Sequence, residues 1–158
     1  MKFAALVLLL ALSASAQTPP PPEMGLDSFY EKYLDAGGLP IVGSRRVDAR
    51  AFLVARDVLG HMMAKRPDVL RAMVERGAKL GILGADEITT DLPGHRDLYD
   101  VFPGTDWDVR TRGVGGTIDR PLASVGEENL LGIGEDRYIG ECILVHEFGH
   151  SVLNLGVD

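Results

Sequence analysis

Apolar residues recur at helical spacing over two stretches of the chain, and a third stretch near the end is apolar almost throughout. Residues 48–65 carry an apolar stripe that repeats every three or four positions, which predicts an amphipathic helix. The stripe consists of Phe52, Ala55, Leu59, Met62 and Met63. A second helix is predicted to begin at Pro67, because a missing N–H does no harm in a first turn, and to end at Gly77. Residues 138–155 predict a third, largely buried helix.

Short apolar runs between these stretches predict strands. They read LPIVGS at residues 39–44, KLGILG at 79–84 and PLASVG at 121–126. Another short helix is predicted over residues 27–36, with Asp27 as its cap and Gly37 as its end. Its apolar face would comprise Phe29, Tyr30, Tyr33 and Leu34. Alternating helical and strand segments predict an α+β fold, with helices packed on a small mixed sheet.

The stretch from residue 86 to residue 116 shows no sustained periodicity. A long irregular segment inside a domain is usually either functional or poorly ordered. Part of it, residues 106–116, reads DWDVRTRGVGG and is predicted to pack as a loop or to form the rim of a cleft.

The first residues predict an export signal rather than part of the fold. Lys2 precedes an apolar run at residues 3–12, which is shorter than the roughly 20 residues that span a bilayer. Small residues at 14–16 then provide a signal-peptidase site, so we expect a signal peptide at residues 1–16. An uncleaved membrane anchor is the alternative. A run of prolines makes residues 17–25 an extended spacer, and residues 26–158 are expected to form the folded domain.

Composition narrows the compartment and the partners. The chain of 158 residues has a formal net charge of −7. Nucleic acids and anionic membranes are bound by basic faces, so neither is expected as a partner after signal cleavage. We expect a secreted or periplasmic protein. Cys142 is the only cysteine, which excludes an intrachain disulfide, and it is predicted to be a small buried core residue.

The sequence HEFGH, inside the last predicted helix, carries the most specific chemistry of the chain. His146 and His150 lie one helical turn apart, so their imidazoles can converge on one Zn²⁺ ion. Glu147 is rotated by about 100° from His146, which places it beside the ion rather than on it. It can then accept a proton from zinc-bound water as a general base. The alternative is a structural helix whose polar side chains are satisfied within the protein.

Other polar residues are weaker candidates. Cys142 lies four residues before His146, but about 12 Å of helix separates it from His150, so these two cannot share an ion. His61 is predicted to lie at the boundary of the core, and His95 on the surface of a loop.

An acidic pair precedes the last helix. Glu127 and Glu128 are predicted to be solvated or to cap a neighbouring element, although one of them could orient an active-site group.

At HEFGH the chain resembles the zincin metallopeptidases. Longer stretches, among them RRVDARAFLVARDVLGHMMAKRPDVL and RYIGECILVHEFGHSV, are similar to a group of secreted zinc peptidases that we associate with the anthrax lethal factor catalytic-domain superfamily. The resemblance covers roughly residues 26–155. It implies a zincin-like fold with the HExxH helix packed against the sheet, Zn²⁺ as cofactor, His146 and His150 as metal ligands and Glu147 as the base.

The third zinc ligand is where the sequence departs from these families. The metzincin pattern needs a glycine and a histidine where this chain has Leu153 and Gly156, so that subgroup is excluded. The resemblance implies instead a glutamate ligand beyond Asp158. We therefore expect the sequence to be the N-terminal part of a longer domain, and residues 17–158 alone to bind zinc weakly and to lack peptidase activity. Asp158 itself is a weak alternative ligand, because it is the terminal residue.

Together these features predict a secreted zinc metallopeptidase. It would hydrolyse the bonds of a peptide or protein substrate through a zinc-activated water, with Glu147 as general base. The alternatives are a non-catalytic exported binding domain of zincin-like fold and a zinc hydrolase acting on a non-peptide amide. Glu147 favours catalysis, because a domain that only binds needs no base beside its histidines.

Overall fold

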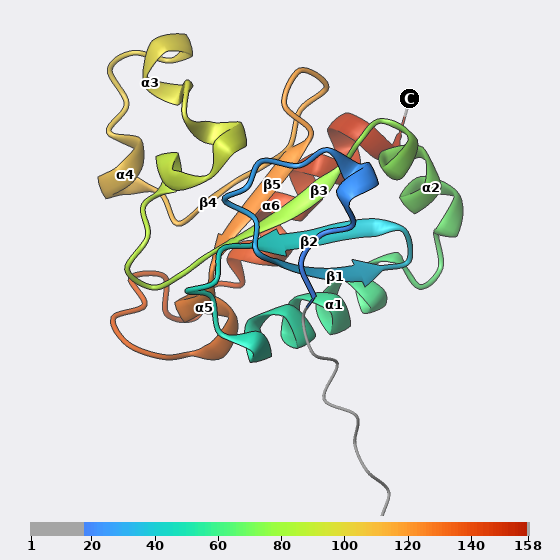
Figure 1. Cartoon of the computed structure of the whole chain (residues 1–158), viewed down its shortest axis with the longest axis horizontal. Coiled ribbons are helices and arrows are strands. Elements are labelled where there is room, and N and C mark those ends of the chain that lie inside the picture. Colours follow the sequence, from blue (N-terminus) through green and yellow to red (C-terminus); the bar gives the residue numbers. More distant parts are fainter. Residues whose placement is uncertain (1–17, 158) are drawn as a thin grey trace, which may run out of the picture.

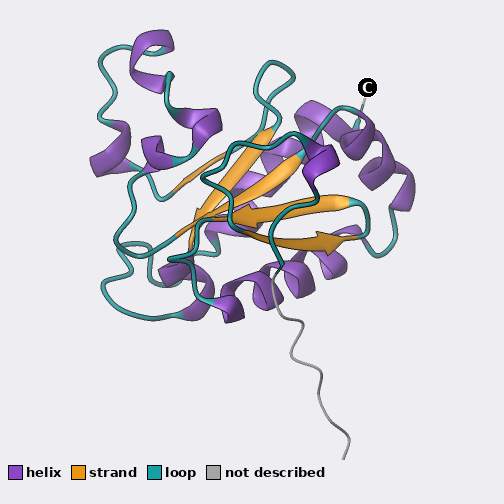
Figure 2. Ribbon diagram, viewed as in Figure 1, coloured by secondary structure: helices purple, strands orange, loops and turns teal. Residues whose placement is uncertain are grey.

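The computed structural model describes residues 18–157, which are built around one mixed sheet (Figures 1 and 2). The predicted signal peptide at residues 1–16 and the alternative ligand Asp158 lie outside the described residues. Where the spacer was predicted, Thr18 forms an isolated bridge with Tyr33, and the proline run ends in a single 3-10 turn, Pro22–Met24.

The sheet has five strands in the order β1-β2-β3-β5-β4. Their bounds are β1 Lys32–Ala36, β2 Leu39–Gly43, β3 Lys79–Leu83, β4 Gly113–Val114 and β5 Leu122–Gly126. The three central strands, β2, β3 and β5, run parallel, while β1 and β4 are antiparallel edges. These central strands are the three that the apolar runs predict. The predicted α+β fold with a small mixed sheet is confirmed.

Two of the predicted helices form where the apolar stripes place them. They are α1, Ala49–Met63, and α2, Pro67–Glu75. Asp48 caps α1 by accepting the Arg50 N–H, and Pro67 begins α2 as predicted. The other α-helices are α3 Leu98–Val101, α4 Trp107–Arg110, α5 Glu127–Leu131 and α6 Ile143–Ser151. No helix within residues 18–157 has the length and apolar character that crossing a membrane requires.

The helix predicted over residues 27–36 is wrong, because this segment leads into strand β1 and a hairpin. Gly37 and Gly38 both have positive φ, 69° and 94°, which suits a two-residue turn joining β1 to β2. Asp35 accepts hydrogen bonds from both glycine N–H groups and so stabilises the turn. The Gly-Gly pair was the sequence signal for this hairpin, and it outweighs the helical spacing of the aromatic residues.

Alternate residues of the central strands face two cores of unequal size. The larger core lies under α1, α2 and α6, on one face of the sheet (Figure 1). Its strand residues include Leu39, Ile41, Leu80, Ile82, Ala123 and Val125. The opposite face carries a smaller cluster of Tyr30, Val42, Leu83, Leu92 and Leu122. The irregular segment 86–116 contributes to this second layer through η2, Thr89–Asp91, and η3, Pro93–His95.

His95 lies in this second layer, so its predicted place on the surface is wrong. Its side chain is fully buried, with Nε2 3.0 Å from the Ser124 hydroxyl and Nδ1 3.1 Å from the Gly94 carbonyl oxygen. The Ser124 hydroxyl also accepts the N–H of Val114, so Ser124 connects His95 to the edge strand β4. Burial lowers the pKa of His95 from 6.5 to about 4.

This buried histidine makes stability depend on pH. Since its pKa is lower in the folded state, the unfolded chain binds the extra proton first as the pH falls below 6.5. The free energy of unfolding should therefore fall between pH 6.5 and about 4, by on the order of 3 kcal/mol from this residue. When the unfolding free energy is measured by urea denaturation at several pH values in that range, it should change less with pH for His95→Gln than for the native chain. His61→Gln is the matched control, and an unchanged pH dependence in His95→Gln would contradict the assignment.

Candidate metal centre on helix α6

Helix α6 is placed by an apolar face that lies against the sheet. Leu144, Phe148 and Ser151 are buried at helical spacing, and Leu155 continues this face in the π-helical turn Val152–Gly156. The helix begins at Ile143, so its predicted start at residue 138 is wrong. Gly140, with a φ of 91°, interrupts the helical backbone before it.

The first turn of α6 is capped by a side chain from another helix, α5. The side-chain oxygen of Asn129, in α5, accepts the Ile143 N–H, and its amide nitrogen donates to the Glu141 carbonyl oxygen. Cys142 precedes the helix on this connection and is exposed, so its predicted burial in the core is wrong. Cys142 occupies the N-cap of α6, one residue before the apolar residues that pack against the sheet.

The two histidines of the motif converge on one point beside α6. The Nε2 atoms of His146 and His150 lie 3.2 Å apart, and the ring centroids 4.8 Å apart with an interplanar angle of 76°. Two nitrogens that each lie about 2.0–2.1 Å from a tetrahedral ion would be about 3.3 Å apart. Both rings are exposed and are therefore accessible to an ion from solvent. The pair fits the spacing that a shared Zn²⁺ requires.

Glu147 is positioned differently from the histidines. It is half-buried between α6 and residues 113–115, with the backbone N–H of Gly115 close to its carboxylate. Burial raises the pKa of Glu147, while the two imidazoles and the Gly115 N–H oppose the rise. Candidate ligand atoms of Glu147, His146 and His150 all lie within 4.8 Å of one another. The carboxylate is thus close to the point on which the imidazoles converge.

Glycines allow β4 and the residues after it to approach α6. An added Cβ at Gly113 would lie 2.4 Å from Ile143 Cγ2, and one at Gly115 would lie 2.7 Å from His150 Cβ. Side-chain hydrogen bonds fix the same contact. Ser151 Oγ accepts the Gly116 N–H at 2.8 Å, and the Asn154 amide donates to the Gly116 carbonyl oxygen at 2.9 Å. The alternating glycines of RGVGG are the sequence signal for this contact.

Arg112 anchors the start of β4 in a buried polar network. Its guanidinium makes two hydrogen bonds to the Glu128 carboxylate, at 2.6 and 2.9 Å, and donates to the carbonyl oxygens of Gly84 and Glu87. Arg112 is 8% exposed and Glu128 6%. The backbone is held too, because the Arg112 carbonyl oxygen accepts the Gly126 N–H of β5. One end of the edge strand is thereby fixed to the ends of β3 and β5.

Neither of the paired acids is solvated, so that part of the prediction is wrong. Glu127 accepts the backbone N–H groups of Asp48 and Ala85, which ties the cap of α1 to the segment after β3. The alternative function as a cap fits Glu127, which accepts the Asp48 N–H next to α1, while Glu128 neutralises the guanidinium of Arg112. Both carboxylates are engaged in these contacts, and neither belongs to the group around His146.

A cavity of about 170 Å³ opens beside His146 and Glu147. Its walls come from three segments of the chain. They are Thr111, Arg112 and Gly113 around the start of β4, Tyr138 and Glu141 before α6, and Ile143, His146 and Glu147 in α6. Of the two readings of residues 106–116, the cleft rim is therefore supported. Sequence reasoning missed Arg112 and Tyr138, because their partners lie 16 and 28 residues away.

Within residues 18–157, the histidine, cysteine and acidic side chains close enough together to hold one metal ion are those of His146, Glu147 and His150. A catalytic zinc usually has three protein ligands, so a third would come from outside this range. His61 is not part of this group, because it lies on α1, where its ring nitrogen is 2.8 Å from the Asp57 carbonyl oxygen.

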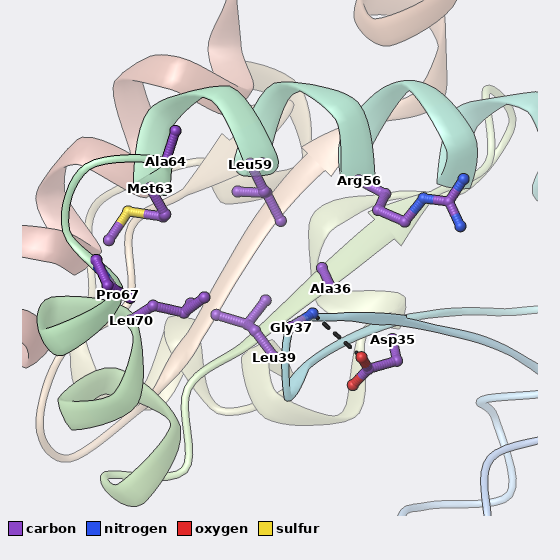
Figure 3. A pocket seen from close by; sticks show the side chains of 11 residues that line it. Asp35, Ala36, Gly37, Leu39, Arg56, Leu59, Met63, Ala64, Pro67 and Leu70 are labelled. Carbon is purple, nitrogen blue, oxygen red and sulfur yellow. Dashed lines mark hydrogen bonds between the residues drawn. The ribbon is translucent and has the colours of Figure 1, made fainter.

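A second hollow, of about 230 Å³, lies between the β1–β2 turn and helices α1 and α2 (Figure 3). Its walls are mainly apolar and include Leu39, Leu59, Met63 and Leu70, with Asp35 turned towards the Gly37 N–H. It shares no lining residue with the α6 cavity and contains no histidine. Within residues 18–157, the group of side chains spaced to hold a metal ion lies on α6.

Comparisons of the chain with protein-family models, curated proteins and solved structures find no match.

The close contact between Gly115 and α6 gives a direct test. Gly115→Ala should lower the free energy of unfolding by about 1–3 kcal/mol, because the new methyl group would overlap the Cβ of His150. Gly60→Ala is the matched control. Its Cβ would meet nothing within 4 Å on α1, so it should stabilise the protein by about 0.5–1 kcal/mol. Equal effects of the two substitutions in urea denaturation would contradict the packing described.

The buried pair should be energetically coupled. Arg112→Met leaves the Glu128 carboxylate without its cation and should cost about 3–5 kcal/mol of unfolding free energy. Glu128→Gln in the same chain should recover part of that loss, giving a coupling energy of about 1–3 kcal/mol in a double-mutant cycle. Arg66→Met, which removes the exposed pair with Asp68, should have little effect. Strict additivity of the two buried changes would show that the pair is not coupled.

Proposed function

We propose that this protein is an exported, zinc-dependent peptidase whose active site is centred on helix α6. The observation that carries the proposal is the convergence of His146 and His150 at 3.2 Å, with the half-buried Glu147 beside them. The resemblance of HEFGH to the zincin motif supports the same conclusion. His146 and His150 would hold the ion, and the third ligand is expected outside residues 18–157.

Each side chain of the site has a separate task in hydrolysis. Bound Zn²⁺ would lower the pKa of a coordinated water towards neutrality and polarise the substrate carbonyl. Glu147 accepts the proton of the attacking water and then donates it to the leaving amine nitrogen. The Gly115 N–H keeps the carboxylate oriented towards β4 between the steps.

The position of β4 supports a peptide as the substrate. This strand is an edge of the sheet and lies directly beside the histidines and Glu147. An extended peptide can add to such an edge through main-chain hydrogen bonds, which bind it without regard to its side chains. Arg112 and the buried pair with Glu128 keep this edge rigid. The scissile bond of a peptide lying along β4 would pass close to Glu147.

Substitutions on α6 separate metal binding from catalysis. Glu147→Gln should retain zinc, because the amide keeps the shape of the carboxylate and Glu147 does not hold the ion. It should lower peptide hydrolysis by about 10²–10⁴-fold through loss of the base. His146→Ala should lose zinc, whereas His61→Ala should not. Zinc is measured by competition with a chromogenic chelator, and hydrolysis with quenched fluorescent peptides.

The assay is run on the full product of the gene, because the third ligand is expected outside residues 18–157. Zinc binding that depends on His146, without cleavage of any peptide, would favour a non-catalytic binding domain. Cleavage of a non-peptide amide alone would favour the other alternative. Hydrolysis that survives Glu147→Gln would remove this residue from the mechanism.

A further inference from the structure

The cavity beside Glu147 has the size of one amino-acid side chain. Its volume of about 170 Å³ lies well below the roughly 300–1,000 Å³ of sites that enclose small-molecule ligands. Ile143, which is 7% exposed, and the ring of Tyr138 give it apolar walls. Tyr138 is held in place because its hydroxyl donates to the Arg110 carbonyl oxygen. A side chain with an unbranched apolar stem suits this space.

The polar groups around the cavity favour a cation over an anion. The guanidinium of Arg112 is already committed to Glu128 and to two carbonyl oxygens, so it offers little to an incoming anion. Glu141 lines the cavity and is exposed, and within residues 18–157 no hydrogen bond or ion pair engages its carboxylate. Its backbone is fixed, however. The Glu141 N–H donates to the Tyr138 carbonyl oxygen at 2.9 Å, and its own carbonyl oxygen accepts from Asn129 at 2.9 Å.

We infer that this cavity is a specificity subsite for a side chain with an apolar stem and a cationic end, such as lysine. The stem lies between Ile143 and Tyr138, and the ammonium group reaches the Glu141 carboxylate at the mouth. The inference rests on the proposed function, because it assigns the substrate residue next to the scissile bond. The subsite would select peptides with a basic residue at that position, while β4 binds their main chain.

The first experiment needs neither zinc nor hydrolysis. The metal-free protein is titrated with n-butylammonium, which reproduces the lysine side chain, and with butyrate and n-butanol as anionic and neutral probes. Amide chemical shifts of Gly113, Tyr138 and Ile143 report occupancy. We expect n-butylammonium to bind with a dissociation constant on the order of 10 mM, more tightly than the other two probes.

Variants of Glu141 test the origin of that preference. Glu141→Gln should weaken n-butylammonium binding by about two- to fivefold, the range expected for one exposed ion pair. Glu141→Lys should reverse the order of n-butylammonium and butyrate. Glu135→Gln, a change of an exposed acid that does not line this cavity, is the matched control and should leave both affinities unchanged. Glu141 is itself exposed, so these variants are expected to fold.

The outcomes separate this inference from the proposed function. If the three probes bind equally, or if Glu141→Gln leaves the preference intact, the subsite assignment is wrong. If the preference is present and the gene product cleaves peptides, peptides that differ only in lysine or norleucine should show a kcat/KM ratio that Glu141→Gln reduces. Absence of cleavage together with selective n-butylammonium binding would count against the peptidase proposal and leave the cation site established.

Discussion

The approach of residues 113–116 to helix α6 is the contact on which the rest of the site depends. The segment lies so close to the helix that a methyl group at Gly113 or Gly115 would overlap its side chains. This closeness half-buries Glu147 and brings the Gly115 N–H to its carboxylate. It also places the sheet edge beside the two histidines. A wider spacing would leave the same helix with a solvated glutamate and no adjacent strand.

That contact is maintained from both sides of β4. On the side of the large core, Ser151 and Asn154 bind the backbone of Gly116. On the opposite face, the buried His95 supports Ser124, which accepts the Val114 N–H. At the start of the strand, Arg112 connects β4 to the carboxyl ends of β3 and β5. Since β4 itself has two residues, Gly113–Val114, its own ladder contributes little, and these side-chain contacts determine its position.

The sequence predicted what depends on local spacing and missed what depends on distant partners. Strands β2, β3 and β5 and helices α1 and α2 follow from runs and stripes of apolar residues, which require no knowledge of neighbours. The pairing of His146 with His150 is equally local, because one helical turn brings the rings together.

The failures have the opposite character. His95 is polar and lies in a glycine- and proline-containing loop, yet a serine 29 residues later provides it with a buried partner. Glu128 is buried because Arg112 neutralises it, which a count of charges along the chain does not reveal. The segment 27–36 has helical spacing but is followed by the Gly37–Gly38 turn, and its pairing with β2 makes the end of the segment a strand. Cys142 shows the limit of apolar character as a guide, because an irregular connection keeps it at the surface.

This division between local and distant determinants applies to the chemistry as well. The convergence of the two imidazoles is a local property of α6, since histidines four residues apart lie one helical turn from each other. The environment of Glu147 is different, because its burial and the nearby Gly115 N–H come from a segment more than 30 residues earlier in the chain. A helix that only held a metal would have no use for this arrangement. The glycines of residues 113–116 have no side chains of their own to contribute, and their effect is to let this segment lie against Glu147, the residue of the motif that is proposed as a base rather than as a metal ligand. The packing of β4 on Glu147 therefore favours a catalytic site over a binding module.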